Sequence, residues 1–147
     1  MSKANDIAEA IKARIETIRA ANGYATDIGQ TVHRGRRQLE TPDTATLYEG
    51  EEDASKPRAV PYTATAIINF TIEACAHCDP DNPDIAGHIL IADIQRAVFS
   101  DDNTLSGLLS ETIQYAGRVI QPRIDGQSIV NVQVRLQATY TLTPATP

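Results

Sequence analysis

The most chemically distinctive residues of the chain are Cys75, His77 and Cys78, which lie within four positions of one another. Thiolates and imidazoles are ligands that zinc prefers, and a closed structural site needs four of them. The chain has only two cysteines, so further ligands would have to come from His33, His88 or another subunit. Because this ligand set is incomplete, we predict that the cluster is not a metal site.

The same cluster is also a weak candidate for covalent catalysis. A Cys–His nucleophilic pair needs an oriented base and an oxyanion donor, and no accompanying sequence pattern supplies them. The chain lacks a phosphate-binding glycine loop, a His-Glu-x-x-His motif and a Gly-x-Ser-x-Gly motif. The acidic runs Asp101–Asp102 and Glu51–Asp53 lie in polar stretches, where solvated charge explains them. We therefore predict no catalytic residue and no cofactor.

Length and charge narrow the class of protein. A chain of 147 residues fits one domain, which we assign to residues 1–147. The net charge of −6 argues against free-standing nucleic-acid binding, although it allows a partner that lies near DNA. No apolar run approaches the roughly 20 residues of a membrane span. The charged N-terminus lacks a signal-peptide core, so we expect a reducing, cytoplasmic setting.

Two amphipathic helices are predicted. Isoleucines from Ile7 to Ile18 recur at spacings of four, four and three, which predicts a helix over residues 4–22 that stops at Gly23. The second helix runs from an Asn82 N-cap, with Pro83 at its first position, to about Val98.

The remaining chain is dominated by alternating apolar and polar residues, which predict strands. Residues 51–61 hold acidic residues and prolines and are predicted to be a mobile connection. Asp125–Gly126 is a hairpin turn pair. The predicted strands cover residues 30–34, 46–51, 62–77, 110–121 and 129–142. The fold class is therefore α+β, with a mostly antiparallel sheet of four to five strands covered on one face by the two helices.

Two surfaces remain as candidate contacts. The outward faces of the strands 62–77 and 129–142 are rich in Thr, Asn and Gln, and Ile67 and Ile129 on these faces favour packing against another subunit over a purely solvated face. Arg34, Arg36 and Arg37 form the basic cluster of the chain. They could be a solvated loop, a nucleic-acid contact or a contact to an acidic protein, and the net charge favours the protein over nucleic acid.

In its order of elements the chain resembles the tail terminator, or tail completion, proteins of long-tailed bacteriophages. The resemblance covers nearly the whole chain and rests on pattern rather than on one diagnostic motif. It is carried by the segment Tyr24–Gly35 after the first helix, the exposed Leu47-Tyr-Glu-Gly-Glu-Glu52 run, the long Thr-rich strand, the Ala92-Asp-Ile-Gln-Arg-Ala97 stretch of the second helix, and the last strand ending at Tyr140.

This resemblance implies an assembly function. Such proteins form a homo-oligomeric ring, usually a hexamer, on the head-proximal end of the tail tube protein, and thereby stop tube polymerisation. The opposite ring face docks to the head–neck connector protein, and DNA passes through the hole without sequence-specific binding. The implied location is the virion tail and neck, reached through the host cytoplasm during assembly, with no membrane involved.

We predict that a basic and an acidic segment contact other subunits, the tube or the connector. Rival interpretations are another head–tail joining protein, a small ligand- or metal-binding α+β protein that uses the Cys–His cluster, and a component of a phage-derived tail-like particle. The predicted contact residues are Arg34, Arg36, Arg37, Glu49, Glu51, Glu52, Asp53 and Arg58.

Overall fold

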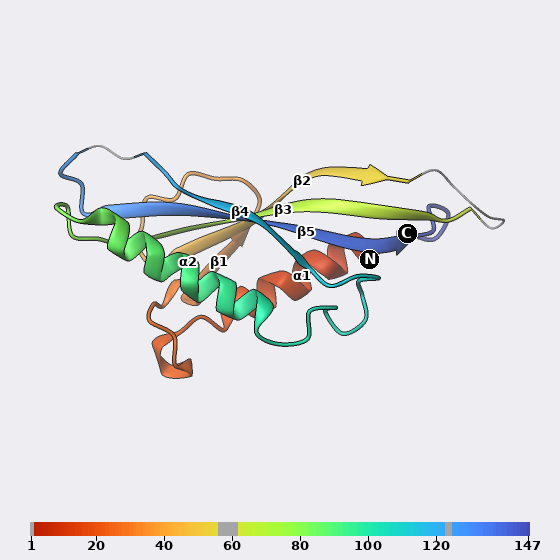
Figure 1. Cartoon of the computed structure of the whole chain (residues 1–147), viewed down its shortest axis with the longest axis horizontal. Coiled ribbons are helices and arrows are strands. Elements are labelled where there is room, and N and C mark those ends of the chain that lie inside the picture. Colours follow the sequence, from red (N-terminus) through yellow and green to blue (C-terminus); the bar gives the residue numbers. More distant parts are fainter. Residues whose placement is uncertain (1, 56–61, 123–124) are drawn as a thin grey trace.

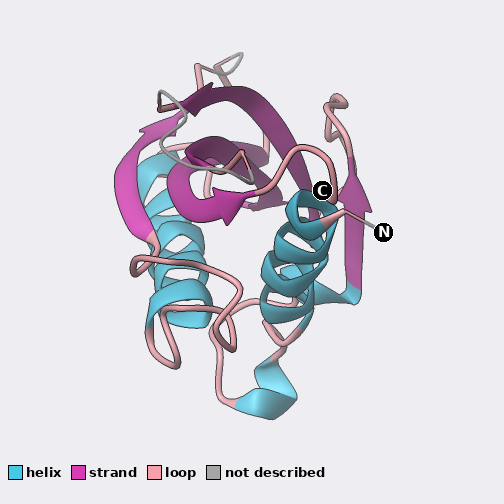
Figure 2. Cartoon of the chain, turned by 90° about the vertical axis from the view of Figure 1, so that its right-hand side faces the viewer, coloured by secondary structure: helices cyan, strands magenta, loops and turns pink. Residues whose placement is uncertain are grey.

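A computed structural model describes residues 2–55, 62–122 and 125–147. Their strands form one sheet in the order β1-β2-β3-β5-β4, in which β1 and β2 are parallel and the other neighbours are antiparallel. Both helices lie on the same side of this sheet, which curves over them (Figures 1 and 2). The predicted α+β fold is confirmed. The main elements are α1 (Lys3–Glu16), β1 (Thr31–Arg34), β2 (Thr44–Ala54), β3 (Ala64–His77), α2 (Pro83–Phe99), β4 (Gln114–Ile120) and β5 (Ile129–Leu142).

The two central strands, β3 and β5, pair along their whole length, from Ala64 opposite Leu142 to His77 opposite Ile129. Side chains alternate between the faces of a strand, so a period of two places every second residue against the helices. Burial of one large apolar side chain there contributes roughly 1.5–3 kcal/mol. The predicted apolar face is confirmed, since the core contains Ala66, Ile68, Phe70 and Ile72 of β3 and Val130, Val132, Val134, Leu136 and Ala138 of β5.

The helix α1 ends earlier than the periodicity predicts. It stops at Glu16, and a short 3₁₀ helix, Ala20–Asn22, follows before Gly23 adopts a φ of +86°. Ile18 remains buried although it lies outside the helix. The spacing of isoleucines therefore identified the buried positions correctly, but it did not show where the backbone leaves the helix.

The helix α2 begins at Pro83, as predicted, but the Asn82 side chain makes no capping hydrogen bond. Its buried face includes Leu90 and Ile94. At the other end, Arg14 of α1 donates a hydrogen bond of 2.8 Å to the carbonyl of Val98. A cation at a helix C-terminus stabilises the unpaired carbonyls there, so this contact also joins the two helices.

Strand β2 is longer than predicted and contradicts part of the expected mobile connection. Glu51 to Ala54 belong to β2, and Glu52 to Ala54 pair with β3 after a bulge between Glu49 and Glu52. Residues 56–61 lie outside the described part of the chain. A glycine and four acids have low strand propensity, but pairing with a long neighbouring strand overrides such preferences. Strand β4 is shorter than predicted, because the residues before Gln114 form a loop whose Ile113 is buried.

The segment that follows α1 is fixed to α2 by a buried carboxylate. Asp93 accepts hydrogen bonds from the backbone N–H of Ala25 at 3.3 Å and of Thr26 at 2.8 Å, and from the Thr26 hydroxyl at 2.7 Å. One turn later, the Arg96 guanidinium lies 4.4 Å from the centroid of the Tyr24 ring. These hydrogen bonds explain why the Asp93 carboxylate can be buried.

Gly29 lies where the chain turns back against the end of α1. Its N–H donates a hydrogen bond of 2.9 Å to the carbonyl of Ile18. A Cβ atom at this position would lie 2.6 Å from the Ile15 carbonyl oxygen and 2.7 Å from those of Glu16 and Ile18. Backbone atoms that end a helix cannot move away independently, so the close approach requires glycine.

We predict that Gly29→Ala lowers the free energy of unfolding by about 3 kcal/mol, because the added methyl group overpacks three carbonyl oxygens. Urea denaturation of the purified chain measures this difference. Gly50→Ala is the matched control, since a Cβ there meets its nearest atom at 3.4 Å. Its effect should stay below about 1 kcal/mol. Equal losses for the two variants would contradict the proposed role of Gly29.

Candidate assembly surface

The sheet face opposite the helices carries mostly uncharged polar side chains that bond to one another across the strands. Gln137 of β5 donates a hydrogen bond of 3.0 Å to the Asn69 side chain of β3. Thr71 and Ile67 of β3 are partly exposed on the same face. A surface with few fixed charges is inexpensive to desolvate, which suits a protein contact.

One carboxylate on this face is buried and belongs to the structure of the sheet. Glu73 is 7% exposed. Its Oε1 accepts hydrogen bonds of 2.7 Å from the Tyr48 hydroxyl of β2 and from the Gln133 amide of β5. Burial, and then the hydrogen bond to Glu73, raise the pKa of Tyr48. The three side chains thus connect three neighbouring strands.

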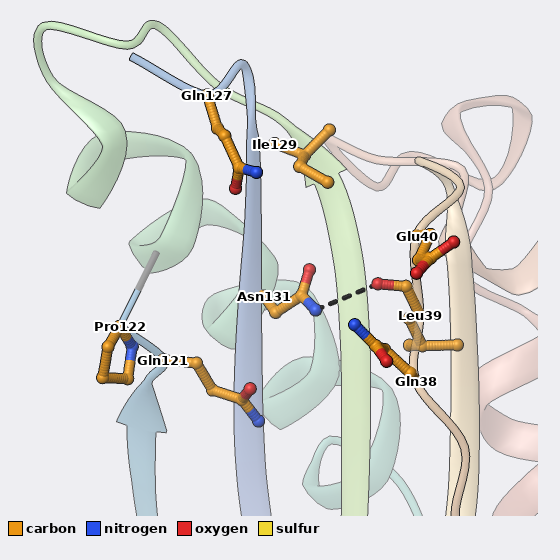
Figure 3. A pocket seen from close by; sticks show the side chains of 8 residues that line it. All are labelled: Gln38, Leu39, Glu40, Gln121, Pro122, Gln127, Ile129 and Asn131. Atoms are coloured by element: carbon orange, nitrogen blue, oxygen red, sulfur yellow. Dashed lines mark hydrogen bonds between the residues drawn. The ribbon is translucent and has the colours of Figure 1, made fainter. Parts of the chain in front are cut away.

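The loop between β1 and β2 covers one end of the same face. Leu39 is buried, and its carbonyl accepts a hydrogen bond of 3.1 Å from the Asn131 side chain of β5 (Figure 3). The Asp43 N–H donates to the Cys75 carbonyl at 2.8 Å. This covering explains why Glu73 and Cys75 are buried, although strand alternation places them on the polar face.

A groove runs between this loop and the end of β4. We call it the polar groove; in one part it is lined by Gln38, Leu39 and Glu40 on the loop side and by Gln121, Pro122, Gln127, Ile129 and Asn131 on the other side (Figure 3). The adjoining part is lined by Arg36, Arg37, Gln38, Glu73, Val119, Gln121, Pro122, Gln133 and Arg135. The side-chain oxygen of Asn131 is buried there and has no hydrogen-bond partner in the described chain.

The predicted contact residue Arg34 is engaged within the chain. Its guanidinium lies 2.5 Å from a carboxylate oxygen of Glu9 in α1 and 3.5 Å from one of Glu49 in β2. Arg34, in the edge strand β1, thus links α1 to β2. Glu52 is also engaged, because its carboxylate accepts a hydrogen bond from the Tyr140 hydroxyl.

Four other predicted contact residues, Arg36, Arg37, Glu51 and Asp53, have exposed side chains. Arg36 lies 5.8 Å from the centroid of the Tyr48 ring, and Arg37 donates a hydrogen bond of 2.9 Å to the Arg34 carbonyl. Glu51 and Asp53 are exposed on β2. Arg58 lies outside the described residues. The structure therefore separates the predicted set into residues that support the fold and residues that remain available.

Arg135 is a groove residue that the sequence analysis did not select. It is exposed and lines the polar groove together with Arg36 and Arg37. Its charge could have identified it from the sequence, because every other outward position of β5 is uncharged. Its proximity to the basic cluster depends on the path of a loop about a hundred positions earlier in the chain, which no local pattern indicates.

The two cysteines of the Cys–His cluster differ in their exposure. Cys75 is fully buried, and burial raises the pKa of its thiol to about 11. Cys78 is partly exposed, and its Sγ lies 3.8 Å from the carbonyl oxygen of Gln127. Across the described residues, no three His, Cys, Asp or Glu side chains meet in a group that could hold a metal ion.

We predict that iodoacetamide at pH 8 alkylates Cys78 in the folded chain and leaves Cys75 unmodified, because the thiolate is the reactive form and Cys75 is buried as a thiol. Peptide mass spectrometry identifies the modified residue, and alkylation in urea is the control in which both should react. Rapid modification of Cys75 in the folded chain would show that the residue is accessible and that the structural interpretation is wrong.

We also predict that Arg34→Gln lowers the free energy of unfolding by about 1 kcal/mol, since it removes two partly exposed ion pairs. The difference should shrink in about 1 M salt, where the Debye length is about 3 Å. Urea is uncharged, so denaturation in urea measures the stability difference at both salt concentrations without changing the ionic strength. Arg37→Gln is the matched control and should change stability by less than about 0.5 kcal/mol. Identical losses of stability in the two variants would contradict the prediction that the ion pairs of Arg34 stabilise the fold.

Within the described residues, no helix is both long and apolar enough to cross a membrane. Comparison with known proteins identifies no matching family model and no matching curated protein.

Proposed function

We propose that this chain is a structural assembly protein of the tail-terminator type. Copies of it form a ring, of six subunits as in the family that it resembles, on the head-proximal end of a phage tail tube. The ring stops tube polymerisation and offers its other face to a head–neck connector protein. DNA passes through the hole without sequence-specific contacts. The protein acts in the virion tail and neck through assembly alone, without making or breaking covalent bonds.

The observation that carries this proposal is the two-sided sheet. Both helices lie on one face, while the other face is open over much of β3 and β5 and carries uncharged polar groups with Ile67 and Ile129 among them. A subunit of this kind has one self-contained core and a separate surface that can meet another protein. Different surfaces at different places on the subunit are what a cap needs, because one must match the tube and the other must not accept more tube subunits.

The ionisable groups are compatible with a role that requires no catalysis. Clear pKa shifts occur at Tyr48, Cys75, Asp102 and Tyr140 among the described residues. At Tyr48, Cys75 and Tyr140 the principal cause is burial, and at Asp102 it is the hydrogen bond from Thr104. Each shift thus has a structural cause. The net charge of −6 also suits a channel wall that must not hold DNA tightly.

Another head–tail joining protein would have the same geometric requirements, since it too must contact two different partners. The two functions differ in what happens to the tail when the protein is absent. A terminator controls the length of the tube, whereas a neck protein controls only the attachment of a finished tail to a head.

We predict that particles assembled without this chain have overlong tubes that lack heads, because nothing stops tube subunits from adding. Electron microscopy of particles produced with and without the protein measures tail length and head attachment. Adding the purified chain to growing tubes should restore a single length. Tubes of normal length without heads would instead identify a connector, and normal infectious particles would reject both assembly functions.

A further inference from the structure

The arginines of the polar groove form a basic surface without an acidic partner in the described chain. Arg36, Arg37 and Arg135 are exposed, and no described carboxylate lies within salt-bridge distance of any of them. In the part of the groove that these arginines line, the acid Glu73 is buried and already accepts hydrogen bonds from its neighbours, while Glu40 lines the adjoining part. Charges of one sign lining a concave surface attract a ligand of the opposite sign.

A stretch of β2 in the same subunit carries several acidic residues close together. We call residues Glu49–Ala54 of β2 the acidic arm. Glu51 and Asp53 of this arm are exposed, and neither side chain makes a hydrogen bond or ion pair within the described chain. Strand β1 pairs with β2 only as far as Leu47, so along the acidic arm no described strand covers the outer edge of β2. An uncovered edge strand is a site where another chain can add.

Within the described part of one copy, the acidic arm makes no ion pair with the arginines of the polar groove. Asp53 lies opposite Ile67 of β3, whereas the groove residue Arg135 lies opposite Thr71, four positions further along the same strand. At about 3.3 Å per residue, this separation is about 13 Å along the strand. The arm is also held in place by pairing with β3 as far as Ala54. The two surfaces stay unpaired in one copy, and a second copy can offer each of them a complementary surface.

We propose that the acidic arm of one copy docks against the polar groove of the next, with Glu51 and Asp53 facing Arg36, Arg37 and Arg135. This contact uses different surfaces on its two sides, so it is a head-to-tail contact. Repetition of such a contact closes a ring when the rotation allows it. The inference rests on the proposed function for its biological purpose, but the contact itself is argued from charge and geometry.

Two charge-reversal variants test the contact in the full chain. The groove variant carries Arg36→Glu and Arg37→Glu, and the arm variant carries Glu51→Lys and Asp53→Lys. Glu49 and Glu52 stay unchanged because they have partners within the fold. Sedimentation velocity at millimolar protein concentration measures self-association. The association constant of each variant alone should be lower than that of the wild type by a factor of about ten or more, because like charges then meet at every contact.

Mixing the two variants should restore association. The arm of the groove variant remains acidic and fits the unchanged groove of the arm variant, while the new basic arm of the arm variant fits the new acidic groove of the groove variant. Every contact is then complementary in an alternating ring. The mass of the assembly separates a ring, which holds more than two copies, from a two-fold dimer, which would contradict the head-to-tail arrangement.

A variant with Arg19→Glu and Arg118→Glu is the matched control, because it changes the net charge as much as the groove variant does at exposed positions outside both surfaces. It should associate like the wild type. Thermal unfolding by circular dichroism should give similar stabilities for all variants. Association of the wild type should weaken between about 0.1 M and about 1 M salt as the Debye length falls from about 10 Å to about 3 Å.

The outcomes separate this contact from the proposed function. Normal association of both variants, failure of the mixture to associate, or a wild type that stays monomeric at millimolar concentration would overturn the contact, even if tails lose length control without the protein. Rescue by the mixture, together with tails of normal length in the absence of the protein, would keep the contact and reject the tail-terminator function.

Discussion

The pairing of β3 with β5 is the constraint on which the rest of the structure depends. Each strand has 14 residues, and every residue of one has a partner in the other. Because side chains alternate strictly across a strand, this register divides the molecule into an apolar side and a polar side. A shift of the register by one residue would expose the apolar face, so the long pairing also determines where the helices can pack.

The apolar side is completed by contacts between elements that are distant in the sequence. Arg14 of α1 caps the end of α2, and Asp93 of α2 fixes the segment that returns from α1. Gly29 allows that segment to lie directly against the carbonyl groups at the end of α1. Through these contacts the helices form a layer with defined positions, and the opposite face of the sheet needs no second layer of its own.

The polar side of the sheet carries charged side chains that do not take part in holding the fold together. Arg36, Arg37, Glu51 and Asp53 are exposed and make no ion pair within the described chain, whereas Arg34 is held by two carboxylates of its own chain. Opposite charges at different places on the sheet give a subunit direction, since they form no ion pair with each other within one copy. A head-to-tail contact between such subunits gives a closed ring where the rotation closes and an open filament where it does not.

The sequence alone determined the order of the helices and strands and the apolar faces of α1, β3 and β5, because periods of 2 and 3.6 residues are local properties that solvent and core impose on each segment. It identified Arg36 and Arg37 as available charges, but it grouped them with Arg34, and it did not detect Arg135. The tertiary structure alone decided that α1 ends at Glu16, that Glu51 to Ala54 extend β2, and that a loop and two strands enclose a groove. These features depend on pairing between segments far apart in the chain, where the geometry of the neighbour overrides local preference.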